Sequence, residues 1–440
     1  MATSPPSGAP LRQGALSHAL EHSGFVWLTG IEDTFITANH PVTGRSLDEY
    51  ELTGHYRAWA SDLELMAELG VSAVRYGIPW HRINPAPQTW DFTWMDEPLG
   101  RLLELGIEPV VDLVHYGVPA WIEDAFLHPD YPQLVAEYAA RVAERLRGRV
   151  QSFTPLNEPR ITAWYTGKLG FWPPYQRGWS GFLRVLVAVC RGIIETERQL
   201  RAAIPELLSV HVDAADLYTA AEPELEQEAA HRQWIGFLAL DLVSGRVDGA
   251  HPLRRWVEQH GVAARELDVF LERPARPDVI GLNLYPLFSK KVLKRNAGRL
   301  RISMPYAEAS LVEALCSLYH ERYRCPLLIS ETATEGSVAR RAAWLGSSVA
   351  AVGNSRKSGI PVLGYTWWPM FALIAWAYRQ GKKPPQAYLK QMGLWDLAAN
   401  QEGELTRIPT SLVDAYRGYT GGGLATVGKV GRLTPVAAGH

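Results

Sequence analysis

The sequence has little of what marks a secreted, membrane-spanning or cysteine-ligated metal protein. Its cysteines are Cys190, Cys316 and Cys325, an odd number without metal-like spacing, so neither a disulfide framework nor a cysteine metal site is expected. No run of 18 apolar residues occurs, which argues against a membrane span. The first twenty residues contain no apolar core of a signal peptide. Together these absences favour a reduced compartment, and we expect a cytoplasmic protein.

An excess of charge of either sign is also missing. The 440 residues carry 44 basic and 46 acidic side chains, a net charge of −2, which predicts no general affinity for nucleic acid or membranes. Apolar residues make up 47% of the chain, enough for a large core. Phenylalanine, at 11, is outnumbered by 16 tryptophans. An excess of indole rings is therefore the first feature that needs a functional reason.

The two ends of the chain differ in composition from the middle. Residues 1–20 are rich in Pro, Ser, Gly and Ala and predict a flexible leader. Residues 421–440 are small and Gly-rich and predict a flexible tail or a linker stub. Between them no linker and no short-period repeat is visible, so residues 21–420 are expected to form one domain.

Short apolar runs alternate with helical patterns through this domain, for example at His55–Leu69, Tyr131–Arg147 and Gly181–Ala202. Buried parallel strands separated by amphipathic helices have this signature, and eight such units predict a single (β/α)8 TIM barrel. A doubly wound sheet is the competing fold, but no GxGxxG follows the first run. The eight runs are Phe25–Thr29, Ala73–Tyr76, Glu108–Leu113, Val150–Thr154, Leu208–Val212, Asp278–Leu282, Leu327–Ser330 and Val362–Tyr365.

Two glutamates stand at the ends of predicted barrel strands, where the functional residues of this fold lie. Glu158 follows the fourth run and Glu331 follows the seventh, so the two face each other across the barrel mouth. One glutamate at a strand end is more often structural. Two opposed carboxylates, with Asn, Arg and Tyr candidates nearby, are the minimum equipment for glycoside hydrolysis.

Seven segments resemble those of glycoside hydrolase family 1, a family of retaining (β/α)8 glycosidases. They are FVWLTGIED, RYGIPWHRINP, PVVDLVHYGVPAWI, TPLNEP, DVIGLNLYP, LISET and GYTWW, and they span about Phe25 to Leu397. TPLNEP is the most specific of them, because the family carries Thr-Phe-Asn-Glu-Pro at this place. The resemblance implies a β-glucosidase-like O-glycosidase that works by double displacement through a covalent glycosyl-enzyme, with a carbohydrate or glycoside as its substrate and without a metal or cofactor.

The resemblance also assigns roles. Glu158 becomes the general acid/base and Glu331 the nucleophile, with Arg75 and Tyr285 holding the nucleophile. The acid/base then needs a raised pKa and the nucleophile a pKa lowered by Arg75, and retaining geometry puts the two carboxyl groups about 5–5.5 Å apart. The implied substrate-binding residues are His115, Tyr116, Asn157, Asn283, Trp367, Trp368 and Trp376.

The residues that grip the sugar in this family are replaced. Gly30 stands where the family has a Gln, and Glu32 or Asp33 are the candidates to substitute for it. Ala375 stands where the family has a Glu, and Ala372 and Leu373 replace an Asp-Asn pair. A site that loses hydrogen-bonding groups changes its selectivity. We therefore expect a non-standard glycone.

Alternatives remain open at this point. The same two glutamates would serve a transglycosidase, and a non-catalytic carbohydrate-binding barrel is the third reading. Arg379, Lys382 and Lys383 would meet an anionic substrate, although a solvated loop is the favoured interpretation. The Gly-rich tail is compatible with fusion to, or association with, another carbohydrate-active domain.

Overall fold

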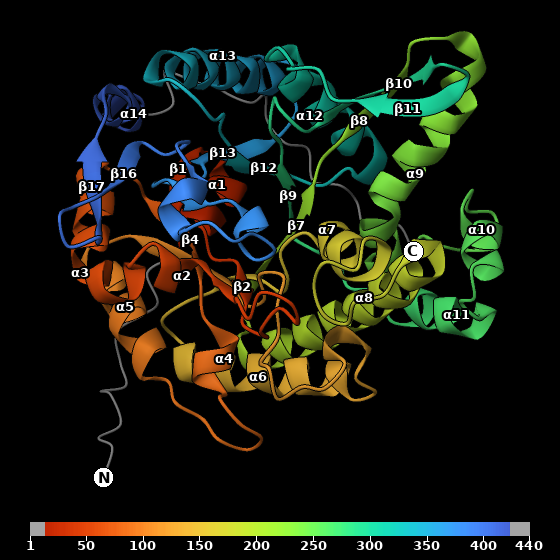
Figure 1. Cartoon of the computed structure of the whole chain (residues 1–440), viewed down its shortest axis with the longest axis horizontal. Helices are drawn as coiled ribbons and strands as arrows, with labels where there is room; N and C mark the ends of the chain where they lie inside the picture. Colours follow the sequence, from red (N-terminus) through yellow and green to blue (C-terminus); the bar gives the residue numbers. More distant parts are fainter. Residues whose placement is uncertain (1–13, 423–440) are drawn as a thin grey trace.

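The computed structural model describes residues 14–422 and contains a closed barrel of eight parallel strands, in the order β1-β13-β12-β9-β7-β6-β5-β4. This confirms the predicted (β/α)8 fold, and each predicted run overlaps one barrel strand. Figure 1 shows the labelled barrel strands in the middle of the molecule, with helices around them. The strands are β1 (Val26–Gly30), β4 (Ala73–Gly77), β5 (Glu108–Asp112), β6 (Ser152–Thr154), β7 (Leu208–Ala214), β9 (Val279–Asn283), β12 (Leu327–Thr332) and β13 (Val362–Trp367).

The apolar runs form these strands because both faces of each strand are covered. Leu28, Ala73 and Val110 belong to a small cluster inside the barrel, whereas Val74 and Val111 belong to the large core under the helices. Successive side chains of a strand point to opposite faces, so a continuous apolar run satisfies both cores. The polar exceptions to these runs gather at the strand ends.

The predicted helical patterns correspond to α3 (His55–Glu68), α6 (Tyr131–Leu146) and α8 (Gly178–Ala203). Short helices and hairpins between the barrel units build the rim. Within residues 14–422, none of the helices has the length and apolarity that crossing a membrane would need. The main helices are α3 (His55–Glu68), α5 (Thr93–Glu104), α6 (Tyr131–Leu146), α8 (Gly178–Ala203), α9 (Glu226–Val243), α12 (Ser310–Tyr323), α13 (Val338–Lys357) and α14 (Ser411–Gly422).

Several short elements surround the end of the barrel where the strands finish. Strand β2 (Phe35–Ile36) pairs with β3 (Leu47–Asp48), and α2 (Glu49–Leu52) follows directly. Helix α7 (Pro159–Ala163) follows β6. Two small sheets complete the loops, β8 (Leu217–Ala220) with β10 (Lys290–Asn296) and β11 (Arg299–Ser303), and β14 (Leu373–Ile374) with β15 (Leu389–Lys390).

The predicted boundaries of the leader and the tail are wrong within the described residues. Helix α1 (Ala15–His22) occupies the end of the expected leader, and its Leu16 and Ala19 are buried against the inner barrel cluster. Glu108, at the start of β5, accepts a hydrogen bond from the Leu16 N–H at 3.0 Å. Helix α14 includes Gly421 and Gly422 of the expected tail. The rest of both segments, residues 1–13 and 423–440, lies outside the described residues.

Candidate active site

Glu158 and Glu331 lie at the ends of their strands and are almost completely buried. Glu331 is the fifth residue of β12, and Glu158 precedes α7 with a left-handed φ of +46°. Their exposed fractions are 5% for Glu158 and 4% for Glu331. Such burial is costly for a charged carboxylate unless other groups stabilise it. The neighbours of each glutamate therefore decide its ionisation.

Glu331 is held by a cation and a hydroxyl group. Its Oε1 accepts a hydrogen bond from Arg75 Nη1 at 2.7 Å, and its Oε2 accepts one from the Tyr285 hydroxyl at 2.7 Å. Arg75 is fully buried in β4 and also donates to Asp112 Oδ2 at 2.8 Å and to Asn157 Oδ1 at 3.0 Å. The predicted contacts of Arg75 and Tyr285 with Glu331 are thus present.

Glu158 contacts only neutral hydrogen-bond donors among the described side chains. Its Oε1 accepts from Asn283 Nδ2 at 2.9 Å, and its Oε2 accepts from the Tyr116 hydroxyl. Asn283 is itself oriented by Ser330, whose Oγ donates to Asn283 Oδ1 at 2.7 Å. Asn283 Nδ2 also reaches Asn157 Oδ1 at 3.2 Å, so one network joins the two glutamates.

Burial dominates the acidity of both carboxyl groups. Burial, reinforced by the charge of Glu331, raises the pKa of Glu158 to about 8. Burial also raises the pKa of Glu331, against the opposing effects of Arg75, His115 and Tyr285. The expectation of a lowered pKa for the nucleophile is therefore wrong in direction, because desolvation outweighs the guanidinium.

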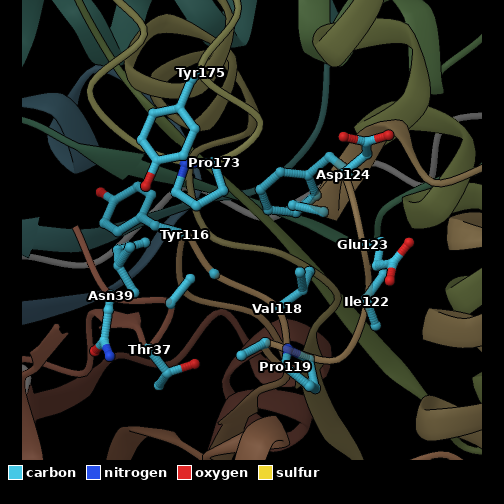
Figure 2. A pocket seen from close by; sticks show the side chains of 16 residues that line it. Thr37, Asn39, Tyr116, Val118, Pro119, Ile122, Glu123, Asp124, Pro173 and Tyr175 are labelled. Atoms are coloured by element: carbon cyan, nitrogen blue, oxygen red, sulfur yellow. The ribbon is translucent and has the colours of Figure 1, made fainter. Parts of the chain in front are cut away.

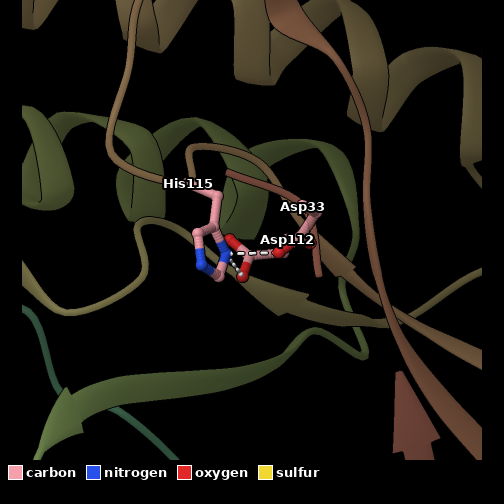
Figure 3. Close-up of side chains that lie close together, drawn as sticks. All are labelled: Asp33, Asp112 and His115. Atoms are coloured by element: carbon pink, nitrogen blue, oxygen red, sulfur yellow. Dashed lines mark hydrogen bonds and ion pairs between the residues drawn. The ribbon is translucent and has the colours of Figure 1, made fainter. Parts of the chain in front are cut away.

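His115 lies between two aspartates that the sequence reasoning did not group with it (Figure 3). Its Nδ1 is 2.6 Å from Asp33 Oδ1 and 3.2 Å from Asp112 Oδ2, and its Nε2 is 2.9 Å from Asn157 Nδ2. Because Asn157 Oδ1 accepts from Arg75, the amide nitrogen of Asn157 faces His115 Nε2, and Nδ1 carries a proton that Asp33 and Asp112 accept. Of the two aspartates, only Asp112 could have been found from the sequence, because it is a charged residue at the end of a barrel strand.

Asp33, Asp112 and His115 also have the spacing of a metal site, with ligand atoms within 4.8 Å of one another. The chemistry around them does not fit a cation. Arg75 Nη2 already contacts Asp112 Oδ2, so a metal ion there would lie beside a buried guanidinium. The donor set is better explained as an ion-pair network that fixes the orientation of His115.

The two consecutive tryptophans after the eighth run have different places. Trp368 lies over the Arg75 guanidinium, 4.8 Å from Cζ to the ring centroid, and donates its indole N–H to Glu32 Oε2 at 3.2 Å. Trp367 is fully buried and donates to the Met392 carbonyl at 3.0 Å. The prediction that Trp367 binds substrate is therefore wrong, because its ring points into the outer core.

Tyr116 and Trp376 belong to an aromatic cluster beside Glu158. The Trp376 ring lies 5.0 Å from that of Tyr116 and 5.0 Å from that of Trp172, and Tyr165 stacks on Trp172 at 4.5 Å. Trp172 is fully buried, whereas Trp376 is half-buried. Part of the tryptophan excess is thus explained by aromatic packing at the barrel mouth.

The substituted sugar-binding positions have structural causes. A Cβ at Gly30 would lie 2.1 Å from Cζ3 of Trp368, so the indole fills the place that a side chain at position 30 would need. Glu49 of α2, which the sequence reasoning missed, is fully buried and accepts a hydrogen bond from the Ile374 N–H at 3.1 Å, next to Ala375. Burial raises the pKa of Glu49 well above its usual range.

The basic residues after the eighth strand do not form an anion site. Arg379, expected in a solvated loop, is fully buried and donates to the carbonyls of Phe171 at 2.9 Å and Ala38 at 2.8 Å. A further bond runs to the Tyr175 hydroxyl at 3.0 Å. Lys382 and Lys383 are exposed, as expected. Arg379 thus ties together loops of the rim.

A cavity of about 230 Å³ is lined in part by Tyr116 and lies between the loops after β1, β5 and α7 (Figure 2). Its walls include Ile36, Val118, Phe126 and Pro173, with Tyr116 itself as part of the lining. The wall of this cavity is mostly apolar.

Comparisons with known proteins show which sequences and folds the chain is similar to. The 6-phospho-β-glucosidase of Dickeya chrysanthemi is 23% identical over 73% of this chain and 76% of its own length. The bifunctional β-D-glucosidase/β-D-fucosidase of Bifidobacterium breve is 34% identical over 30% of this chain, and the match spans only 31% of that enzyme. The structure of a β-glucosidase from Thermotoga maritima in complex with deoxynojirimycin superimposes with a TM-score of 0.77 at 18% identity, over 90% of this chain and 98% of that one. The sequence model of glycosyl hydrolase family 1 matches residues 28–285, more than half of the chain, and the chain therefore belongs to this family.

Proposed function

We propose that the protein is a retaining β-glycosidase in which Glu331 is the nucleophile and Glu158 the general acid/base. The carrying observation is the contrast between their partners: a guanidinium and a hydroxyl on Glu331, but only neutral donors on Glu158. Two carboxyl groups with environments this different have the pattern of an acid and a nucleophile. Near neutral pH the proton belongs to Glu158, whose pKa is about 8.

The reaction then proceeds in two displacements. The Glu331 carboxylate attacks the anomeric carbon while Glu158 gives its proton to the leaving oxygen, which departs as an alcohol and leaves a glycosyl ester. Glu158, now a carboxylate, takes a proton from water as that water attacks the same carbon and releases Glu331. Arg75 and Tyr285 stabilise and orient the Glu331 carboxylate that attacks in the first step and leaves in the second.

We propose an uncharged glycone. Glu32, Asp33 and Asp112 are buried around Trp368 and His115, and the buried cation among them, Arg75, is already shared by two carboxylates. A phosphate or carboxylate on the sugar would meet this acidic wall. Glu32 would accept hydrogen bonds from sugar hydroxyls, and Trp368, which donates to Glu32, would form the floor of the subsite. His115 and Asn157 would offer further hydrogen bonds to the sugar.

Transfer to a sugar or other hydroxyl acceptor is the second candidate. The observation that favours it is the aromatic cluster of Tyr116, Tyr165, Trp172 and Trp376 beside the acid/base, because aromatic faces bind the C–H surface of a second sugar. The product ratio with and without an added glycoside acceptor distinguishes transfer from hydrolysis.

Two substitutions test the roles of the glutamates. Glu331→Gln should lower turnover of aryl β-glycosides by roughly 10⁴-fold or more with the fold intact. Glu158→Ala should lose about 10²–10⁴-fold on poor leaving groups, and azide should restore turnover and give a β-glycosyl azide. Glu335→Gln is the control, since Glu335 pairs with Lys390 outside the site. Full activity of Glu331→Gln would refute the assignment, and an α-azide product would indicate inversion.

A substrate panel tests the glycone. It should contain aryl β-glycosides of glucose, galactose, fucose, xylose, mannose, glucuronic acid and 6-phosphoglucose. We expect turnover among the neutral sugars, and a preference for 6-phosphoglucose or glucuronic acid would overturn the acidic-wall argument.

A further inference from the structure

Tyr116 holds the oxygen of Glu158 that faces away from the protein amide. Asn283 Nδ2 donates to Oε1 of this carboxyl group, and the Tyr116 hydroxyl donates to Oε2. An amide N–H does not accept a proton, so a protonated Glu158 carries its proton on Oε2. In that state the proton points at the phenolic oxygen of Tyr116.

The phenolic oxygen therefore occupies the place of a leaving-group oxygen. We propose that Tyr116 is a positioning residue that holds the proton-donating oxygen of Glu158 in the free protein and is displaced when a glycoside binds. This proposal rests on the assignment of Glu158 as the acid/base. It adds that the substrate must exchange its own glycosidic oxygen for the Tyr116 hydroxyl before proton transfer.

The backbone around Tyr116 favours movement of the side chain over movement of the loop. Tyr116 has a left-handed φ of +69° and Glu158 one of +46°, conformations that non-glycine residues adopt only when their surroundings impose them. The next residue, Gly117, packs so closely that a Cβ there would lie 1.9 Å from the Phe35 carbonyl oxygen. The main chain is thus wedged in place, and the freedom that remains is rotation of the Tyr116 ring.

The structure provides space for that rotation. The cavity of about 230 Å³ includes Tyr116 in its lining, together with Ile36, Val118 and Pro173 (Figure 2). The wall of this cavity is mostly apolar and suits an aromatic ring. Trp376, which also packs against the Tyr116 ring, is not part of that wall. A ring that left Glu158 would therefore have apolar side chains to pack against, in a cavity that Asn39, Glu123 and Asp124 leave partly open to solvent.

Displacement of the hydroxyl changes the acidity of Glu158. A donor to the carboxylate lowers the pKa of that group, so its removal makes Glu158 retain its proton to higher pH. The negative charges of Glu331 and of Asp213 in β7 also raise the pKa of Glu158, whether or not Tyr116 is bound to it. The titratable groups that face Glu158 from the packed elements are Tyr116, Tyr165, Asp213, Tyr285 and Glu331.

The test compares the pH dependence of the free enzyme with that of the substrate complex. The basic limb of kcat/KM reports Glu158 in the free enzyme, and the limb of kcat reports it in the complex. Tyr116→Phe should shift the kcat/KM limb upward by about one pH unit, the worth of one hydrogen bond to a charged group, and leave the kcat limb in place. Tyr131→Phe in helix α6 removes a buried hydroxyl that has no hydrogen-bond partner among the described residues, and it should shift neither limb.

A measurement without turnover keeps the result independent of the proposed activity. With ¹³C-labelled glutamate, the carboxyl resonance that Glu158→Gln removes should titrate about one pH unit higher in Tyr116→Phe than in the unaltered protein. No change in that titration would overturn the proposal, and so would equal shifts of both kinetic limbs, since the hydroxyl would then stay bound in the complex. Absence of glycosidase activity with the expected titration shift would instead count against the proposed function alone.

Discussion

The indole of Trp368 lies directly across the Cα of Gly30. A Cβ at position 30 would stand 2.1 Å from Cζ3 of the ring and 2.8 Å from the carbonyl oxygen of Arg75. The same indole covers the guanidinium of Arg75 and donates to Glu32. One ring position thus depends on the absence of a side chain in the first barrel strand, and it is linked to the residue that holds Glu331.

Gly30→Ala should therefore destabilise the protein and impair the site. The added methyl group forces Trp368 or the strand to move, which costs about 1–3 kcal/mol in a packed core. Denaturant unfolding measures this loss, and kcat/KM on an aryl β-glycoside should fall with it. Gly346→Ala in helix α13 is the control. The nearest neighbouring atom to the added Cβ would be the Tyr419 hydroxyl oxygen, at 3.8 Å, so the methyl group has room. Equal stability of the two variants would contradict the clash.

The barrel was predictable because its physics is periodic. Each parallel strand must be apolar on both faces, so runs such as Ala73–Tyr76 and Leu327–Ser330 were visible without knowledge of their partners. Glu158 and Glu331 were found by the same logic, since a charged residue that ends a buried run needs a reason. Which residue ends a strand can be read from its neighbours in the sequence, without knowledge of the residues that it contacts in space.

The rest of the site was not predictable because it depends on which side chain meets which. Trp367 and Trp368 are adjacent in sequence, yet one ring faces the outer core and the other faces Arg75. Asp33 approaches His115 from a loop, with no periodic signal. Arg379 looks like a surface residue by composition, and its burial depends on carbonyl groups from two other loops.

Stability should respond to pH through Glu158. Its folded pKa of about 8 exceeds the 4.5 of an ordinary glutamate, so between these values the folded state holds a proton that the unfolded state has lost. The free energy of unfolding therefore decreases as pH rises across this interval. Glu158→Gln removes the penalty and should be the more stable protein at pH 8, by on the order of a few kcal/mol.

The comparison must be repeated at acid pH. At pH 4 both states of the unaltered protein hold the proton, so the difference between it and Glu158→Gln should nearly vanish. Denaturant titrations at the two pH values give both numbers. A constant difference across the interval would mean that Glu158 is not the group with the raised pKa.

Arg379 should matter for stability and not for substrate charge. Arg379→Lys keeps the charge but loses the fork that reaches three oxygen atoms, and we expect a loss of about 2–4 kcal/mol. Lys382→Met and Lys383→Met are the matched controls and should stay within about 0.5 kcal/mol of the unaltered protein. Thermal unfolding of the three variants measures the contrast, and three similar melting temperatures would disprove it.

Activity should not depend on a divalent metal ion, because Arg75 and His115 already occupy the carboxylate oxygens of Asp112 and Asp33 that such an ion would need. Prolonged treatment with EDTA, followed by assay with and without added Zn²⁺, measures this. Asp33→Asn should lower kcat/KM about 10-fold or more, because His115 loses the charge of the nearer of its two carboxylate partners, an effect of the size found when supporting partners of a histidine are removed. Loss of activity in EDTA that Zn²⁺ restores would reverse this view of the cluster.

Helix α1 packs against the end of the barrel that lies away from Glu158 and Glu331. Leu16 and Ala19 close the end where the strands begin, whereas both catalytic candidates lie where the strands finish. Residues at the closed end of such a barrel serve stability and those at the open end serve catalysis. Heat resistance and catalytic rate are therefore separable traits in this chain, and directed evolution that confines its changes to the packing of α1 could improve the first without touching the second.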